Sequence, residues 1–146
     1  MFRWRGAQLE VLLVHPGGPF WTRKDEGAWT IPKGEIGEGE DPLVAARREV
    51  AEETGAVPEG IFLPLTPVRQ AGGKIVQAWA VESDLDPADV RSNTFEIEWP
   101  PRSGRRQAFP EIDRAAWLTI PAARAKILRG QLPLIDELAR QQSRAG

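Results

Sequence analysis

Apolar residues follow regular patterns along this chain, and the patterns predict where its strands lie. The run QLEVLLV, residues 8–14, is almost continuously apolar and precedes a Pro-Gly-Gly-Pro stretch, which predicts a mostly buried strand followed by a turn. NTFEIEW, residues 93–99, alternates apolar and polar positions, as a strand with one wet face does. Between them, residues 61–70 and 74–82 read as two strands around the turn Gly72–Gly73. We place 74–82 centrally in the sheet because few of its positions are polar.

A helix is expected from Pro42 to about Thr54, with Asp41 as its cap and Gly55 as its end. Further elements are a short strand over 29–31, a helical turn within 84–92, a basic loop over 100–107, a strand over 114–119, a helix over 121–129, and a last helix from Pro133 with Leu134, Ile135 and Leu138 on one face. Strands and helices mixed in this order predict an α/β layer sandwich.

Composition narrows the class of protein. The 146 residues suit one domain, 1–146, and the formal charge of -2 gives the whole molecule no bulk attraction to nucleic acid. The chain has no cysteine, so disulfides and thiolate metal sites are excluded. No apolar run approaches the roughly 18 residues of a membrane helix, and MFRWRGAQLEV does not resemble a signal peptide. We therefore expect no membrane partner and a cytoplasmic location.

Carboxylates are crowded on the helix expected over 42–54. On a helical wheel, Glu49, Glu52 and Glu53 share one arc, while Leu43 and Val50 lie on the opposite side. Such a face, taken alone, is usually only a solvated helix surface. Side chains three and four residues apart can also converge on one point, where Mg²⁺ or Mn²⁺ accepts oxygen ligands.

The residues around these glutamates decide between the two interpretations. From Gly34 to Ala56 the chain matches the pattern G-x5-E-x7-R-E-U-x-E-E-x-G-U, where U is a bulky aliphatic residue; only the last position, Ala56, is smaller than the pattern asks. This stretch resembles the Nudix box, and Trp29 to Lys33 resembles the approach to that box. The resemblance implies a Nudix-type α/β/α sandwich with a mixed β-sheet. It also implies a longer first strand than Met1 to Arg5 can supply.

The resemblance assigns roles to residues of the box. Glu49, Glu52 and Glu53 match the metal-binding carboxylates, and Arg48 would pair with a box glutamate and orient it. Nudix enzymes often add a carboxylate from a loop before the last strand, for which Glu111 is the candidate; a surface glutamate is the alternative. The general base would be a box glutamate, with Glu52 favoured over Glu53, or Glu111.

Substrate contacts are expected outside the acidic face as well. Gly34 lies where the loop bends, and the backbone carbonyl of Lys33 is an expected further metal ligand; Glu40 would brace the loop against the helix. The basic loop would grip the outer phosphates, with a solvated loop as the alternative, and Lys33 and Lys74 could help; its arginines are Arg102, Arg105 and Arg106.

The resemblance implies a pyrophosphohydrolase that uses Mg²⁺, or Mn²⁺, to cleave a nucleoside diphosphate linked to another group. The Pro-Lys-Gly approach resembles the branch that acts on dinucleoside polyphosphates such as diadenosine tetraphosphate, and a nucleoside triphosphate is the other expected substrate. The partner is then a small nucleotide or polyphosphate, with nucleic acid entering only as a capped RNA end. The alternative is a Nudix-fold module that binds a nucleotide without cutting it.

Two other residue types bear on the site. His15, the single histidine, follows the first long strand and reads as structural. Of the six tryptophans, most should be core, and Trp21 and Trp99 are candidates for stacking on a base.

Overall fold

The computed structural model describes residues 1–32, 39–54, 60–70 and 72–145, with the side chains of residues 53, 54, 144 and 145 also outside the description. A three-stranded antiparallel sheet forms its centre, in the order β1 (Phe2–Arg5), β2 (Gln8–Pro16) and β9 (Ile112–Thr119). The apolar run predicted over 8–14 is the buried middle strand, β2. Because β2 has a partner on each edge and apolar side chains on both faces, it lies at the core of the molecule.

The segments predicted as two long strands form a hairpin of short pieces. β3 (Leu63–Pro64) pairs with β6 (Trp79–Ala80), and β4 (Val68–Arg69) pairs with β5 (Ile75–Val76). Both glycines of the expected turn have positive φ, and the N–H of Gly73 donates to the carbonyl of Gln70. The end of this segment also joins β1, since Phe2 donates to the carbonyl of Val81 and accepts from Ser83. The predicted central position of 74–82 is therefore confirmed, although the strand is interrupted.

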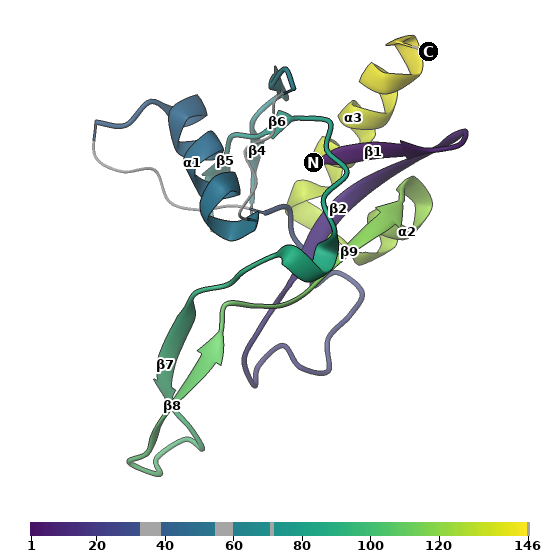
Figure 1. Ribbon diagram of the computed structural model, residues 1–146. Helices are drawn as coiled ribbons and strands as arrows, with labels where there is room; N and C mark the ends of the chain where they lie inside the picture. Colours follow the sequence, from purple (N-terminus) through teal and green to yellow (C-terminus); the bar gives the residue numbers. More distant parts are fainter. Residues whose placement is uncertain (33–38, 55–59, 71, 146) are drawn as a thin grey trace.

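A second hairpin projects from the body of the molecule (Figure 1). It consists of β7 (Thr94–Glu98), which confirms the strand predicted over 93–99, and β8 (Arg106–Pro110), which the sequence analysis assigned in part to a loop. Phe95 lies opposite Phe109, with 6.1 Å between their ring centroids.

The helices lie on opposite sides of the strands (Figure 1). The helix predicted over 42–54 is present with the same bounds, and the last helix buries Leu134, Ile135 and Leu138 as expected. The expected helical turn within 84–92 is also present. The bounds are α1 (Pro42–Thr54), η1 (Pro87–Asp89), α2 (Ile120–Lys126), η2 (Arg129–Gln131) and α3 (Leu132–Ala145). In the described part of the chain, no helix is long and apolar enough to cross a bilayer.

His15 ties the end of β2 to the loop that follows it. Its ring is fully buried, with Nδ1 2.7 Å from a carboxylate oxygen of Asp113 and Nε2 2.6 Å from the backbone carbonyl oxygen of Lys24. The ring also meets Trp29 edge to face at 5.2 Å between centroids. The structural role predicted for this histidine is confirmed: it holds loop residues 17–28 against β9.

Candidate metal and substrate site

The start of α1 is fixed by its own sequence. The Asp41 carboxylate accepts hydrogen bonds from the N–H groups of Leu43 at 3.1 Å and Val44 at 3.2 Å, as the predicted cap should. Pro42 occupies the first helical position, where no N–H donor is needed. This start sets which residues of the helix face the interior: Ala45 is buried, whereas Glu52 keeps 56% of its side chain exposed.

One guanidinium joins three carboxylates along α1. Arg48 donates through Nε and Nη2 to the two carboxylate oxygens of Glu40, both at 2.9 Å. Its Nη1 donates to Glu49 at 3.0 Å and to the oxygens of Glu52 at 3.3 Å. The predicted pairing of Arg48 with box glutamates is therefore present, and the two-point contact with Glu40 braces the loop against the helix.

The charges around Arg48 stabilise its protonated form. The hydrogen bond to Glu40 is the main cause that raises the pKa of Arg48 above its ordinary value; desolvation acts against it, and Glu52 and Glu49 add to the rise. Glu49 and Glu52 thus turn their oxygens toward one positive nitrogen. The convergence that the helical wheel predicts holds for this pair.

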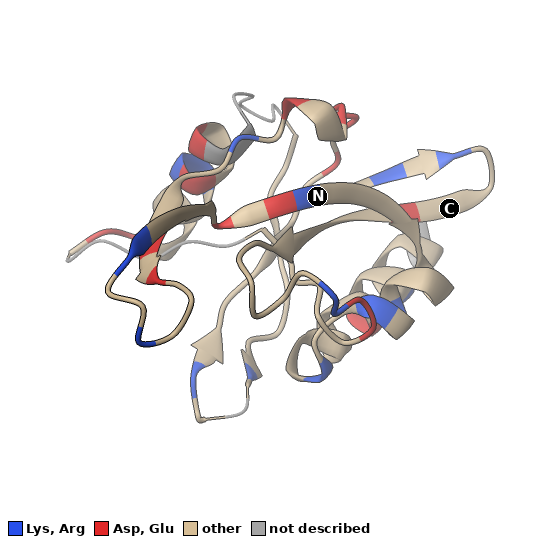
Figure 2. Cartoon of the chain, turned by 90° about the horizontal axis from the view of Figure 1, so that it is seen from below, with Lys and Arg blue, Asp and Glu red and all other residues tan. Residues whose placement is uncertain are grey.

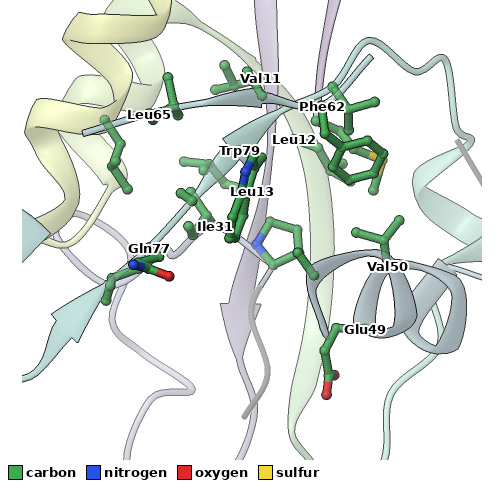
Figure 3. A pocket seen from close by; sticks show the side chains of 18 of the residues that line it. Val11, Leu12, Leu13, Ile31, Glu49, Val50, Phe62, Leu65, Gln77 and Trp79 are labelled. Atoms are coloured by element: carbon green, nitrogen blue, oxygen red, sulfur yellow. The ribbon is translucent and has the colours of Figure 1, made fainter. Parts of the chain in front are cut away.

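A cavity of about 1190 Å³ opens beside these carboxylates. Figure 3 shows Leu13, Ile31 and Trp79 on the strand side of the cavity and Val50 on α1. The Glu49 carboxylate lies at its edge and points away from the apolar side chains (Figure 3). A mainly apolar cavity with charged groups at its mouth suits a ligand that has one flat apolar part and one charged part.

Polar side chains complete the lining. Lys74, Gln77 and Arg91 border the cavity, and within the described residues their side chains make no ion pair or hydrogen bond. Asn93 borders it at the base of the projecting hairpin. These groups are therefore available to a ligand that enters the cavity.

The structure brings part of the predicted metal set together. Glu49, Glu52 and Glu111 line the same cavity, although they come from α1 and from the junction before β9. Glu111 is exposed, and its backbone is held by hydrogen bonds to loop residue Gly17 and to Asn93. The Glu53 side chain, Lys33 and Gly34 lie outside the described residues.

The predicted phosphate-binding arginines lie elsewhere. Arg102 and Arg105 belong to the loop of the projecting hairpin and Arg106 begins β8, and this cavity is not lined by any of the three. Figure 2 shows the basic residues of that loop in blue. The contact of these three arginines with substrate remains a prediction. The basic side chains that line this cavity are those of Lys74 and Arg91.

Several lining residues were not identified from the sequence. Trp79 lines the cavity, whereas the two tryptophans proposed for stacking, Trp21 and Trp99, do not. Gln77 and Arg91 were also not predicted as lining residues. The apolar alternation of 74–82 could have indicated that Gln77 and Trp79 share one face of a strand, but no local signal connects that face with α1.

The carboxylates suit a hard divalent cation by type. Oxygen ligands are those that Mg²⁺ and Mn²⁺ prefer, and Glu49 and Glu52 share one cationic partner. In the described residues, however, no three acidic or histidine side chains are close enough together to hold a metal ion. Two of the predicted ligands, the Glu53 side chain and the Lys33 carbonyl, lie outside the described residues.

Comparison with solved structures shows the fold. The NUDIX domain of Shewanella oneidensis NrtR complexed with ADP ribose superposes with a TM-score of 0.61 and 21% identity over 97% of this chain and 82% of that one. A mutT/nudix family protein from Listeria innocua superposes with a TM-score of 0.65 and 15% identity over 99% of this chain and 90% of that one. At these identities the likeness establishes the Nudix fold, which confirms the predicted α/β class.

Sequence relatives match over part of their length. An RNA pyrophosphohydrolase of Caulobacter vibrioides is 52% identical over 50 residues, 31% of this chain and 29% of that protein. An 8-oxo-(d)GTP phosphatase of Mycolicibacterium smegmatis is 31% identical over 123 residues, 80% of this chain and 29% of that protein. The chain thus spans less than a third of the length of these relatives. The family model of the NUDIX domain matches residues 2–138, and the chain belongs to the Nudix family.

Proposed function

We propose that this chain is a metal-dependent pyrophosphohydrolase that cleaves a nucleoside diphosphate linked to a further group. The observation that carries the proposal is that Glu49, Glu52 and Glu111 line one mainly apolar cavity. Names of relatives agree with this class of substrate: one is an RNA pyrophosphohydrolase and another an 8-oxo-(d)GTP phosphatase. Diadenosine tetraphosphate and nucleoside triphosphates are the first substrates to test.

One group of residues would bind the metal ion, and a second group would bind the nucleoside and its phosphates. Glu49, Glu52 and Glu53, with Glu111, would bind Mg²⁺ or Mn²⁺, which when bound neutralises phosphate charge and acidifies a water. Arg48 orients Glu49 and Glu52 through the hydrogen bonds described above.

The opposite side of the cavity would hold the nucleoside and its phosphates. The indole of Trp79 offers a flat surface for a base. The amide of Gln77, which has no hydrogen-bond partner among the described residues, can donate to or accept from the edge of a base. Lys74 and Arg91 are placed to pair with phosphate oxygens, since both line the cavity without a partner among the described residues.

Proton transfer is assigned to an exposed carboxylate. Glu52 is more exposed than Glu49, with 56% against 19% of the side chain, so water reaches its oxygens more readily. We place the general base at Glu52, with Glu111, which lines the same cavity, as the second candidate.

Carboxylate-to-amide variants test the proposal. Release of mononucleotide from diadenosine tetraphosphate, a nucleoside triphosphate, ADP-ribose and 5′-triphosphorylated RNA is measured with Mg²⁺ and with Mn²⁺. Glu52→Gln should lower kcat about 10²–10⁴-fold, the usual loss when a general base is removed. Glu26→Gln is the matched control, because Glu26 is an exposed loop glutamate that does not line the cavity. Undiminished turnover by Glu52→Gln would refute its role.

Metal binding has a readout that does not depend on turnover. A cation present at about 100 times its Kd stabilises the folded state by about 2.7 kcal/mol. A thermal-melt titration with MnCl₂ should show this stabilisation in the parent and lose most of it in Glu49→Gln. Tight nucleotide binding without turnover in either metal would instead favour a module that binds a nucleotide without cutting it. The complex of the similar NrtR domain with ADP ribose is a reason to test this alternative.

A further inference from the structure

Aromatic rings join the projecting hairpin to the loop after β2. Phe20 meets Trp99 edge to face, with 5.4 Å between ring centroids and 79° between planes. Phe20 nevertheless keeps 62% of its surface exposed, and Trp99 is half-buried. Nearby in the same loop, the ammonium of Lys24 lies 5.0 Å from the ring centroid of Trp21. One exposed ring and two half-buried rings, from two adjoining segments, are therefore combined with a cation.

The register of the hairpin places positive charge on the same face as these rings. Trp99 donates to the carbonyl of Arg105, which continues the β7–β8 ladder beyond the pair Glu98 and Arg106. Because paired residues share a face and alternate along a strand, Trp99 and Arg105 lie on one face and Glu98 with Arg106 on the other. The acidic residues of β7 are thereby kept on the side away from the rings.

Two arginines of this hairpin loop are unpaired among the described residues. Arg102 and Arg105 are exposed, and no described carboxylate forms an ion pair with either. Arg106, by contrast, lies 3.6 Å from Glu96 on the opposite face. We name Phe20, Trp21, Lys24, Trp99, Arg102 and Arg105 the hairpin surface.

We propose that the hairpin surface binds single-stranded nucleic acid. Guanidinium groups without an ion pair among the described residues suit phosphates, and the exposed ring of Phe20, with the half-buried rings of Trp21 and Trp99, offers faces on which bases stack without regard to sequence. An acidic peptide would use the arginines but would leave the rings without flat partners. Duplex nucleic acid keeps its bases stacked within the helix, so it could use only the charges.

The hairpin also leads toward the candidate site, and this step rests on the proposed function. Arg91, Asn93 and Glu111 at the base of the hairpin line the cavity. The five residues of β7 span about 17 Å at roughly 3.3 Å per residue between that base and the tip. A strand whose 5′ phosphates lie at the carboxylates can therefore run along the hairpin to the surface. The substrate class that follows is a 5′-phosphorylated single strand.

Binding of a labelled oligonucleotide tests the surface apart from catalysis. The probe is a 5′-triphosphorylated RNA of about ten nucleotides, within the 4–16 nucleotides that small single-strand sites cover. Its affinity for the full chain is measured by fluorescence anisotropy over a series of salt concentrations, without divalent metal. Arg102→Ala/Arg105→Ala should reduce the slope of log K against log salt by about 1.4, or about 0.7 for each lost phosphate contact.

Two further variants separate the contribution of charge to RNA affinity from that of base stacking and from nonspecific loss of charge. Phe20→Ala should weaken binding about five- to one-hundred-fold with little change of slope, since base stacking on a ring is worth that range. The matched control is Arg5→Ala/Arg140→Ala, which removes the same charge from exposed positions of β1 and α3. It should leave affinity and slope near those of the parent. Phe20→Ala and the control pair should retain the parent's hydrolysis of a nucleoside triphosphate.

The outcomes distinguish the two proposals. Failure of the hairpin variants to change RNA affinity, or equal affinity for an RNA duplex or a polyglutamate peptide, would overturn the hairpin surface as a single-strand site. Binding that responds as stated, with no hydrolysis of any substrate, would support the surface and reject the proposed activity. Binding and nucleoside triphosphate hydrolysis as expected, with the RNA probe left uncut in Mg²⁺, would overturn the path from the hairpin to the carboxylates.

Discussion

Replacing His15 by leucine should destabilise the fold, although leucine has a similar volume. The imidazole contacts two oxygen acceptors, the Asp113 carboxylate at 2.7 Å and the Lys24 carbonyl at 2.6 Å. Leucine offers neither a donor nor an acceptor. The variant therefore leaves the Lys24 carbonyl without its partner and removes the cross-link between loop 17–28 and β9.

The size of the effect follows from the surroundings of each acceptor. A buried acceptor that loses its donor costs about 1–3 kcal/mol, which is an upper range for the Lys24 carbonyl because its hydrogen bond is only partly buried. The Asp113 side chain keeps 28% of its surface exposed and lies 3.6 Å from Arg114, so water and the guanidinium compensate part of its loss. We expect a total of about 2–4 kcal/mol. For 146 residues, with about 2.1 cal/mol/K of unfolding entropy per residue, this lowers Tm by about 7–13 °C.

Urea unfolding followed by tryptophan fluorescence measures the change, and a double-mutant cycle assigns it. Asp113→Asn keeps an oxygen acceptor and should destabilise less than His15→Leu. In the leucine background the same asparagine substitution should have almost no effect, which gives a coupling energy of about 1–2 kcal/mol. An unchanged unfolding midpoint for His15→Leu, or additive effects in the cycle, would refute the role of the ring as a clamp.

Three further predictions test the packing and the loop. Ile127→Ala should destabilise the fold by about 2–5 kcal/mol in urea unfolding, since Ile127 is buried in the core, and an unchanged midpoint would contradict its place there. Gly18→Ala should also lower the midpoint, because Gly18 has a φ of 98° and an added Cβ would lie 2.8 Å from the Phe95 ring; wild-type stability would contradict this close contact. The hydrogen bond from Lys126 is the main cause that lowers the pKa of Asp25, so its stabilisation is present at neutral pH and is lost as pH falls below about 4. Asp25→Asn should therefore destabilise the protein at pH 7, and its effect should shrink steadily as the pH is lowered below about 4; an effect that does not change over that range would count against the pairing.

The sequence predicted those elements whose signals are local. The helix over 42–54 begins at a residue that can cap it, and the Asp41 carboxylate makes the expected bonds. The strand over 93–99 has a clear alternation that its pairing partner preserves. Its partner, β8, lacks such a signal because RQAFP has two polar residues in sequence and a terminal proline. This segment forms a strand because it pairs with β7, so its conformation depends on the neighbouring strand more than on its own sequence.

Elements that depend on distant pairing were predicted less well. The segment over 61–70 forms two short pieces because Pro64 and Pro67 have no N–H to donate to a ladder. In the site, the spacing of Glu49 and Glu52 was enough to predict their convergence. The facing wall with Trp79 was not predictable, since residues far apart in sequence meet there only through tertiary packing.

The contacts of Arg48 change what metal binding means for this helix. Crowded carboxylates suggest a bare negative site that a divalent ion would relieve, yet Glu49 and Glu52 already share an internal counter-ion tethered by Glu40. If these carboxylates bind metal as proposed, loading would exchange one cation for another. The binding free energy measured in a titration would then be the difference between what the carboxylates gain from the metal and what they lose with the guanidinium. The guanidinium, still bound to Glu40, would stay beside the site and pair with the carboxylates again when the metal leaves.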